Sequence, residues 1–225
     1  MYKLLFIDEE KEQFEYFLDY VDGSDAKLKF EIITQLPLKT LNEMIGQIIK
    51  INPDAIIVDY WLNEKKSDLE SNYNVPYNGV ELVEEFQSIR QKFPCFVLTA
   101  KDGDAVSTSK DVNIVYTKSL MHNESSETNA KATFTDRVFN QIEHYKSRIE
   151  NAKSQLSELL EIRIAGKADI DIENKIIELD DFLEKSIDAK NSIPSEFKSL
   201  SNSNRLDNIL NRVDELLKKI DNNAK

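Results

Sequence analysis

The feature that most constrains the fold is an alternation of short apolar runs with amphipathic segments, which fills the first half of the chain. Five short runs are mainly apolar, at residues 4–7, 30–33, 55–58, 96–98 and 114–116, and Glu31 is the one charged residue within them. Such runs are typical of strands covered on both faces, as in a parallel sheet. Segments with helical spacing lie between them, at 10–21, 38–51 and 79–93. The sequence therefore predicts a three-layer α/β domain with right-handed crossovers and five strands in the flavodoxin-like order 2-1-3-4-5.

The second half has a different pattern, which predicts an all-α region. From Val138 to Leu159 the apolar residues fall alternately four and three positions apart, which is a heptad pattern, and Gly166 is suited to end this helix. Further apolar seams run over 172–183 and 206–220, and the segment 191–204 indicates a loop. We therefore expect a domain at 1–125, followed at 130–225 by a helical hairpin and a third helix. These helices form either a bundle within the chain or a coiled coil with a second chain, such as a homodimer.

Composition excludes several classes of protein. The 225 residues carry a net charge of −12, which argues against binding to nucleic acid. One cysteine and two histidines exclude a disulfide framework and leave little for a zinc or histidine metal centre. No apolar run reaches the length of a membrane span, and the N-terminus does not resemble a signal peptide, so we expect a cytoplasmic protein with no membrane partner. Most of the charge lies in residues 1–129, which have 13 Lys and Arg against 23 Asp and Glu.

Polar residues follow four of the five predicted strands at the point where each strand ends. Asp8 and Glu9 follow the first, Asp59 the third, Thr99 the fourth and Lys118 lies just beyond the fifth. Because the carboxyl ends of parallel strands meet at one edge, these side chains should converge. Oxygen ligands without histidine or cysteine favour Mg²⁺, which would allow one carboxylate to attack a phosphoryl group. The lysine would neutralise phosphoryl charge, and the threonine could donate a hydrogen bond to a phosphoryl oxygen.

This order of strand-end residues resembles the receiver domain of two-component response regulators, over roughly residues 1–120, about half of the chain. The resemblance implies that Asp59 accepts a phosphoryl group from a histidine kinase or a phosphotransfer protein, and that Thr99 and Lys118 contact this group. It implies no enzymatic activity beyond phosphorylation and dephosphorylation of the domain itself. It also implies a set of Mg²⁺ ligands, which are Asp8, Glu9, Asp59 and the backbone carbonyl of Trp61.

The sequence departs from the family pattern at several positions. Ser119 stands where the family usually has proline, and Val115 stands at the position of the switch aromatic. Tyr116 is one residue further on and should therefore face the opposite side of the sheet. The segment 101–113 is short and rich in poor helix formers, so the fourth helix should be short or absent. A polar insert at about 63–78 is interpreted as a solvated loop, a lid or a partner-reading loop.

We therefore expect a response regulator that signals through protein contacts or dimerisation of its helical region. The alternative is a pseudo-receiver, an adaptor that uses the same fold without being phosphorylated. A phosphohydrolase is disfavoured because neither strand-end acidic cluster has the Asp-x-Asp pattern. His144 is interpreted as a solvent-facing residue of a helix, and Cys95 as a small core residue.

Overall fold

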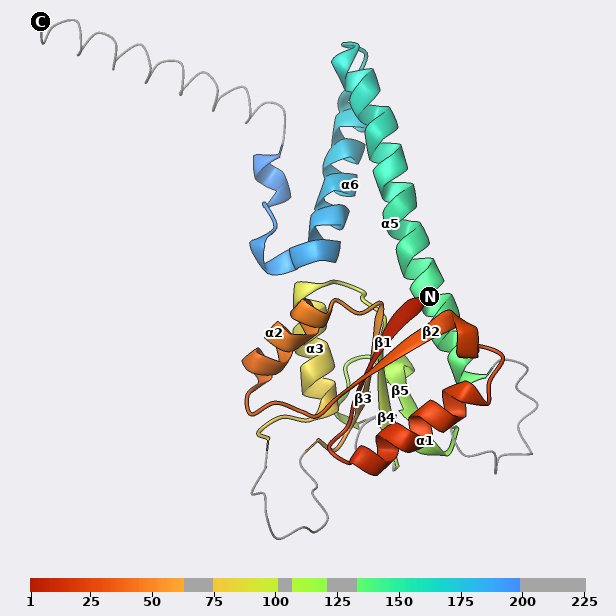
Figure 1. Cartoon of the computed structure of the whole chain (residues 1–225). Coiled ribbons are helices and arrows are strands. Elements are labelled where there is room, and N and C mark those ends of the chain that lie inside the picture. Colours follow the sequence, from red (N-terminus) through yellow and green to blue (C-terminus); the bar gives the residue numbers. More distant parts are fainter. Residues whose placement is uncertain (63–74, 101–106, 121–132, 199–225) are drawn as a thin grey trace, which may run out of the picture. The chain divides into compact units, whose positions relative to one another are not determined.

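The structure, a computed structural model, describes residues 1–62, 75–100, 107–120 and 133–198 (Figure 1). The chain forms two compact units, Met1–Ser147 and a second that begins at Arg148. Helix α5 begins in the first unit and continues into the second.

The first unit is built on a parallel sheet of five strands in the order β2-β1-β3-β4-β5. The strands are β1 (Tyr2–Ile7), β2 (Phe30–Gln35), β3 (Ala55–Asp59), β4 (Cys95–Thr99) and β5 (Val115–Thr117). Every residue of β3 and β4 is buried, and both strands are apolar except at their last positions, Asp59 and Thr99. The predicted flavodoxin-like strand order is confirmed, and such a sheet fits a receiver-like fold.

Helices cover both faces of this sheet. Helix α1 (Lys11–Asp22) lies on one side, and α2 (Leu41–Ile51) and α3 (Gly79–Ile89) lie on the other (Figure 1). Successive residues of β1 point to opposite faces, so Leu4 and Phe6 pack with α1 and the start of α5 (Phe134–Ile164). Leu5 and Ile7 pack in the other core, against α2 and α3.

Helix starts follow local capping chemistry rather than the apolar pattern alone. Helix α2 begins at Leu41, three residues later than expected, because Thr40 and Glu43 form a reciprocal capping box. Asn78 and Glu81 form the same arrangement at the start of α3. Helix α3 ends at Ile89, earlier than expected, because the next residue is extended.

Parts of the predicted insert and fourth helix lie outside the described residues, at 63–74 and 101–106. Ser107 and Thr108 are helical, and the chain then enters β5 through a short 3-10 turn, η2 (Val112–Ile114). Two further 3-10 turns are η1 (Lys27–Lys29) and η3 (Lys118–Leu120). The end of the insert is packed rather than solvated, since Val75 and Tyr77 are buried and the Tyr77 hydroxyl donates to the Leu38 carbonyl at 2.7 Å.

The second unit is a helical hairpin made of the later turns of α5 and of α6 (Ile170–Asp188). Gly166 ends α5 as predicted, with a φ of 67° and with bonds from its N–H to Arg163 and from the Lys167 N–H to Ile162. The Arg163 guanidinium pairs with Glu173 across the turn. Two 3-10 turns follow, η4 (Ala189–Asn191) and η5 (Ser195–Phe197), and the seam at 206–220 lies outside the described residues.

Within the described ranges, no helix combines the length and the apolarity that crossing a membrane requires.

Candidate functional site

The first part of the site is the turn between β1 and α1, which carries Asp8 and Glu9. Asp8 is fully buried, because it directly follows a central strand. Its Oδ1 accepts a hydrogen bond from the Glu10 N–H at 2.9 Å, which holds the turn closed. Its other oxygen, Oδ2, accepts a hydrogen bond from the Lys118 ammonium at 3.0 Å.

Asp59 ends β3 and is 3% exposed. Its Oδ2 accepts a hydrogen bond from the Trp61 N–H at 2.8 Å, and its Oδ1 lies 2.7 Å from the Lys118 ammonium. The Trp61 ring is half-buried and packs edge-on against Tyr60, with centroids 4.7 Å apart. These contacts fix the Asp59 carboxylate, while the Trp61 carbonyl remains a predicted ligand.

Gly79 also belongs to the site, although sequence reasoning treated it only as the start of a helix. A Cβ on this residue would lie 2.1 Å from the Asp59 carbonyl oxygen, and the Gly79 N–H bonds to the Tyr60 carbonyl at 2.9 Å. The start of α3 can therefore lie against the end of β3 only because this residue lacks a side chain. The sequence feature that could have indicated this close contact is the single glycine between the insert and the helix.

Lys118 joins the two buried aspartates. Its side chain is 15% exposed, and its ammonium lies within hydrogen-bonding distance of both carboxylates. Burial by itself lowers the pKa of Lys118, but the charges of Asp59 and Asp8 outweigh it, so the pKa is raised overall. The lysine is therefore a fixed cation between two acids, within reach of any anion bound at Asp59.

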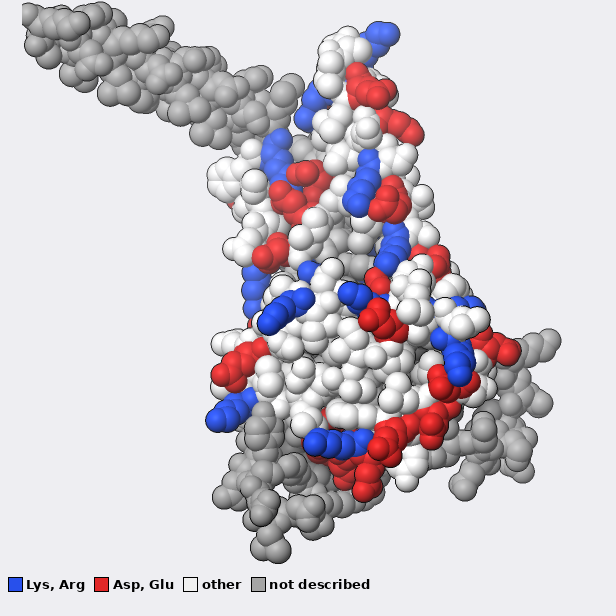
Figure 2. Space-filling model, viewed as in Figure 1, with Lys and Arg blue, Asp and Glu red and all other residues white. Residues whose placement is uncertain are grey.

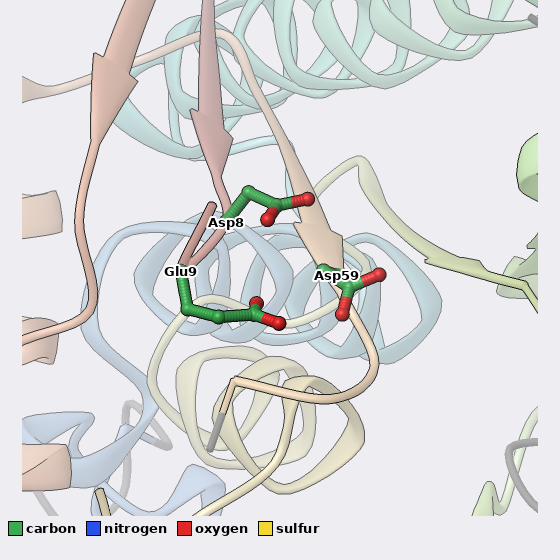
Figure 3. A group of neighbouring side chains, drawn as sticks. All are labelled: Asp8, Glu9 and Asp59. Carbon is green, nitrogen blue, oxygen red and sulfur yellow. The ribbon is translucent and has the colours of Figure 1, made fainter. Parts of the chain in front are cut away.

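Asp8, Glu9 and Asp59 form an acidic cluster (Figure 3), and one carboxylate oxygen from each lies within 4.8 Å of the others. Burial is the main cause of a raised pKa for all three, about 6 for Asp8 and about 9 for Glu9. Glu9 Oε2 is buried and has no hydrogen-bond partner among the described residues. An orphaned carboxylate oxygen beside two further carboxylates suits a hard divalent cation, so the residues present fit the Mg²⁺ implied by the sequence.

The remaining predicted residues lie at the same edge of the sheet. Thr99 is fully buried at the end of β4 and is in register with Thr117 of β5. Thr117 and Ser119 flank Lys118 in the sequence, and their hydroxyls form a hydrogen bond of 2.8 Å with each other. The structure thus brings the predicted strand-end residues to one edge, whereas His144 is exposed on α5 and Cys95 is buried in β4, as expected.

Val115 and Tyr116 face opposite sides of the sheet, as predicted. Val115 packs with the core under α2 and α3, whereas Tyr116 packs with the core under α1 and α5. The Tyr116 ring lies against Phe134, the first residue of α5, with centroids 5.2 Å apart, and against Phe96 at 5.9 Å. The aromatic residue nearest to Lys118 on β5 therefore contacts the start of α5.

The negative charge of this unit extends beyond the site. Figure 2 shows acidic side chains gathered over α1, where Glu12, Glu15 and Asp19 are exposed. Acidic residues of the first unit thus include both a buried cluster at the sheet edge and an exposed face of α1.

Comparison with known proteins leaves the family open. No family model matches the chain, and no curated protein matches it. A similar solved structure is that of the anti-anti-sigma factor PhyR from Bartonella quintana, at 13% identity and a TM-score of 0.42 over 68% of this chain. The alignment spans about half of that protein, 51% of its chain. A likeness at this level carries no argument about function. The functional argument rests on the geometry of the site.

Proposed function

We propose that this chain is a response regulator whose first unit is phosphorylated on Asp59 in the presence of Mg²⁺, and whose helical region passes the signal to a protein partner or a second copy. One observation carries the proposal. At the carboxyl edge of a parallel sheet, Lys118 bridges the buried carboxylates of Asp8 and Asp59, beside the orphaned carboxylate oxygen of Glu9.

The phosphoryl donor is proposed to be a phosphohistidine of a kinase or a phosphotransfer protein. A carboxylate oxygen of Asp59 forms a bond to phosphorus, and the bond from phosphorus to the histidine nitrogen breaks. The leaving imidazole keeps the bonding electron pair and takes a proton from water. Asp59 must be ionised for this attack, and the Lys118 ammonium at 2.7 Å favours the ionised form against the effect of burial.

The surrounding residues have separate roles in this proposal. Asp8, Glu9 and Asp59 would hold the Mg²⁺, which when bound neutralises negative charge on the transferred group. Lys118 is already held at Asp59 and can pair with a phosphoryl oxygen without a large movement. Thr99, buried at the end of β4, is proposed to donate a hydrogen bond to another phosphoryl oxygen.

The test is phosphorylation by a small-molecule donor such as acetyl phosphate, followed by intact-protein mass spectrometry. We expect one added phosphoryl group with Mg²⁺ and none with EDTA. Asp59→Asn should abolish the addition, whereas Asp25→Asn, which alters an exposed acid, should leave it unchanged. Phosphorylation that persists in Asp59→Asn would disprove the assignment.

A second candidate function, an adaptor that is not phosphorylated, is favoured by the position of Tyr116. In this chain the β5 aromatic contacts Phe134 on the α5 side, and Val115 occupies the other face. The adaptor hypothesis expects the same oligomeric state with and without beryllofluoride and Mg²⁺. A shift in molar mass by light scattering would exclude it.

A further inference from the structure

The helical hairpin of the second unit has an apolar side that two helices cover only in part. Ala152, Ile176 and Leu179 are buried between the helices. Four larger apolar residues that continue the same seams are only half-buried, and they are called here the hairpin seam: Leu156, Leu159, Ile172 and Leu183. A pair of helices leaves such a stripe half open, and a third amphipathic helix completes the burial in a bundle.

The chain that follows α6 turns back along that helix. The Ile193 N–H donates to Glu184 Oε2 at 2.9 Å. The Lys198 ammonium lies 2.7 Å from the Glu184 carboxylate and 2.8 Å from the Asp180 carboxylate, and its side chain is only 8% exposed. The last described residue is therefore fixed beside the middle of α6.

The remaining 27 residues contain a segment that matches the hairpin seam in length and pattern. Leucine, valine and isoleucine recur at heptad spacing in this segment, at Leu206, Leu210, Val213, Leu217 and Ile220. As a helix, residues 206–220 would be about 22 Å long, against about 28 Å for α6. The seven residues from 199 to 205 can span up to about 24 Å, which is enough for such a helix to start beside either half of α6.

Charge and the covalent connection to α6 both favour this segment, rather than a second copy of the hairpin, as the occupant of the hairpin seam. Helix α6 contains seven acidic residues and two lysines, so two copies of α6 would repel each other. Residues 199–225 contain five Lys and Arg against four Asp and Glu, which removes this repulsion. A short linker also holds the segment at an effective concentration on the order of millimolar, which a second chain does not reach in dilute solution.

We propose that residues 206–220 dock on the hairpin seam of their own chain and complete a three-helix bundle. The docked segment covers the half-buried residues of α5 and α6 with its own apolar face. A second chain cannot use the hairpin seam while the segment is docked, so the helical region is monomeric on its own. This inference does not depend on phosphorylation of Asp59.

The experiment compares Leu210→Asp with Asn208→Asp, each in the whole 225-residue chain, by hydrogen–deuterium exchange and sedimentation velocity. Both substitutions add one negative charge, but position 208 lies on the opposite side of the segment from its apolar residues. We expect amides of α6 from 172 to 183 to exchange at least about tenfold faster in Leu210→Asp, because burying one leucine is worth about that factor in an equilibrium constant. Asn208→Asp should match the unmodified protein, and the unmodified chain should sediment as a monomer.

Two results would overturn the proposal. Equal exchange of α6 in both variants would show that the segment does not cover the hairpin. A dimeric unmodified protein that becomes monomeric in Leu210→Asp would show that the seam pairs with a second copy instead.

Discussion

Replacing Glu9 by glutamine should stabilise the metal-free protein and weaken its response to Mg²⁺. Glu9 Oε2 is buried without a hydrogen-bond partner among the described residues, beside the carboxylates of Asp8 and Asp59. Burial, and then the charges of these two aspartates, raise the pKa of Glu9 to about 9. Glutamine keeps the size of the side chain, has no charge to desolvate, and can donate hydrogen bonds to the aspartates.

The direction of this stability change follows from the pKa of Glu9 in the unfolded and in the folded protein. In the unfolded chain its pKa is near 4.5, and in the folded protein it is about 9. The contribution of this group to the free energy of unfolding is therefore fully present below the unfolded pKa and is lost as pH rises towards the folded one. Each pH unit in this window lowers the free energy of unfolding by at most about 1.4 kcal/mol. Because Glu9 is only partly buried, we expect Glu9→Gln to raise the free energy of unfolding by on the order of 1–3 kcal/mol at pH 8.

Urea unfolding at pH 5 and pH 8, with EDTA or with excess Mg²⁺, measures this effect. The gain of Glu9→Gln in EDTA should be larger at pH 8 than at pH 5. Added Mg²⁺ should stabilise the unmodified protein more than the variant, because a bound ligand stabilises only the state that binds it. Glu12→Gln, on the exposed side of α1, is the control and should change neither value. A metal-free Glu9→Gln that is less stable than the unmodified protein at pH 8 would refute the reasoning.

Three further substitutions test other parts of the structure. Gly79→Ala should lower the free energy of unfolding by about 1–3 kcal/mol in urea, because its Cβ would meet the Asp59 carbonyl at 2.1 Å. Its control is Gly46→Ala, which meets nothing within 4 Å in α2 and should stabilise by about 0.5–1 kcal/mol. Lys118→Met leaves two buried carboxylates without their cation and should cost about 3–5 kcal/mol at pH 7, with the loss shrinking as pH falls and the acids protonate; a loss that is independent of pH would contradict this. Gly166→Ala, at a φ of 67°, should cost about 1 kcal/mol and speed amide exchange at the end of α5, and unchanged exchange there would contradict the left-handed cap.

The sheet and its order were predictable because burial on both faces leaves a direct mark in the sequence. Residues 55–58 and 96–98 are apolar without interruption, and the structure buries all of β3 and β4. Helix ends were less predictable, since α2 starts where Thr40 and Glu43 cap it rather than where its apolar pattern begins. Capping depends on a few polar atoms, whereas the apolar pattern depends on a whole helix face.

The set of strand-end residues was also predictable, but not their contacts. Parallel topology alone requires Asp8, Asp59 and Lys118 to end at one edge. The sequence does not show that one lysine bridges both aspartates, or that Glu9 keeps an oxygen without a partner among the described residues. These features depend on side-chain directions and on burial, which arise only when the strands assemble into one sheet.

By itself, the sequence determined the α/β architecture, the strand order, the helical hairpin and the identity of the residues at the sheet edge. These follow from patterns that repeat along one chain, because apolar periodicity reflects which face of each element is covered. Only the tertiary structure decided that Gly79 must lack a side chain beside Asp59, that Tyr116 packs against the start of α5, and that Lys198 returns to the middle of α6. Each of these joins residues distant in sequence, and close approach between distant segments leaves no periodic mark in the sequence.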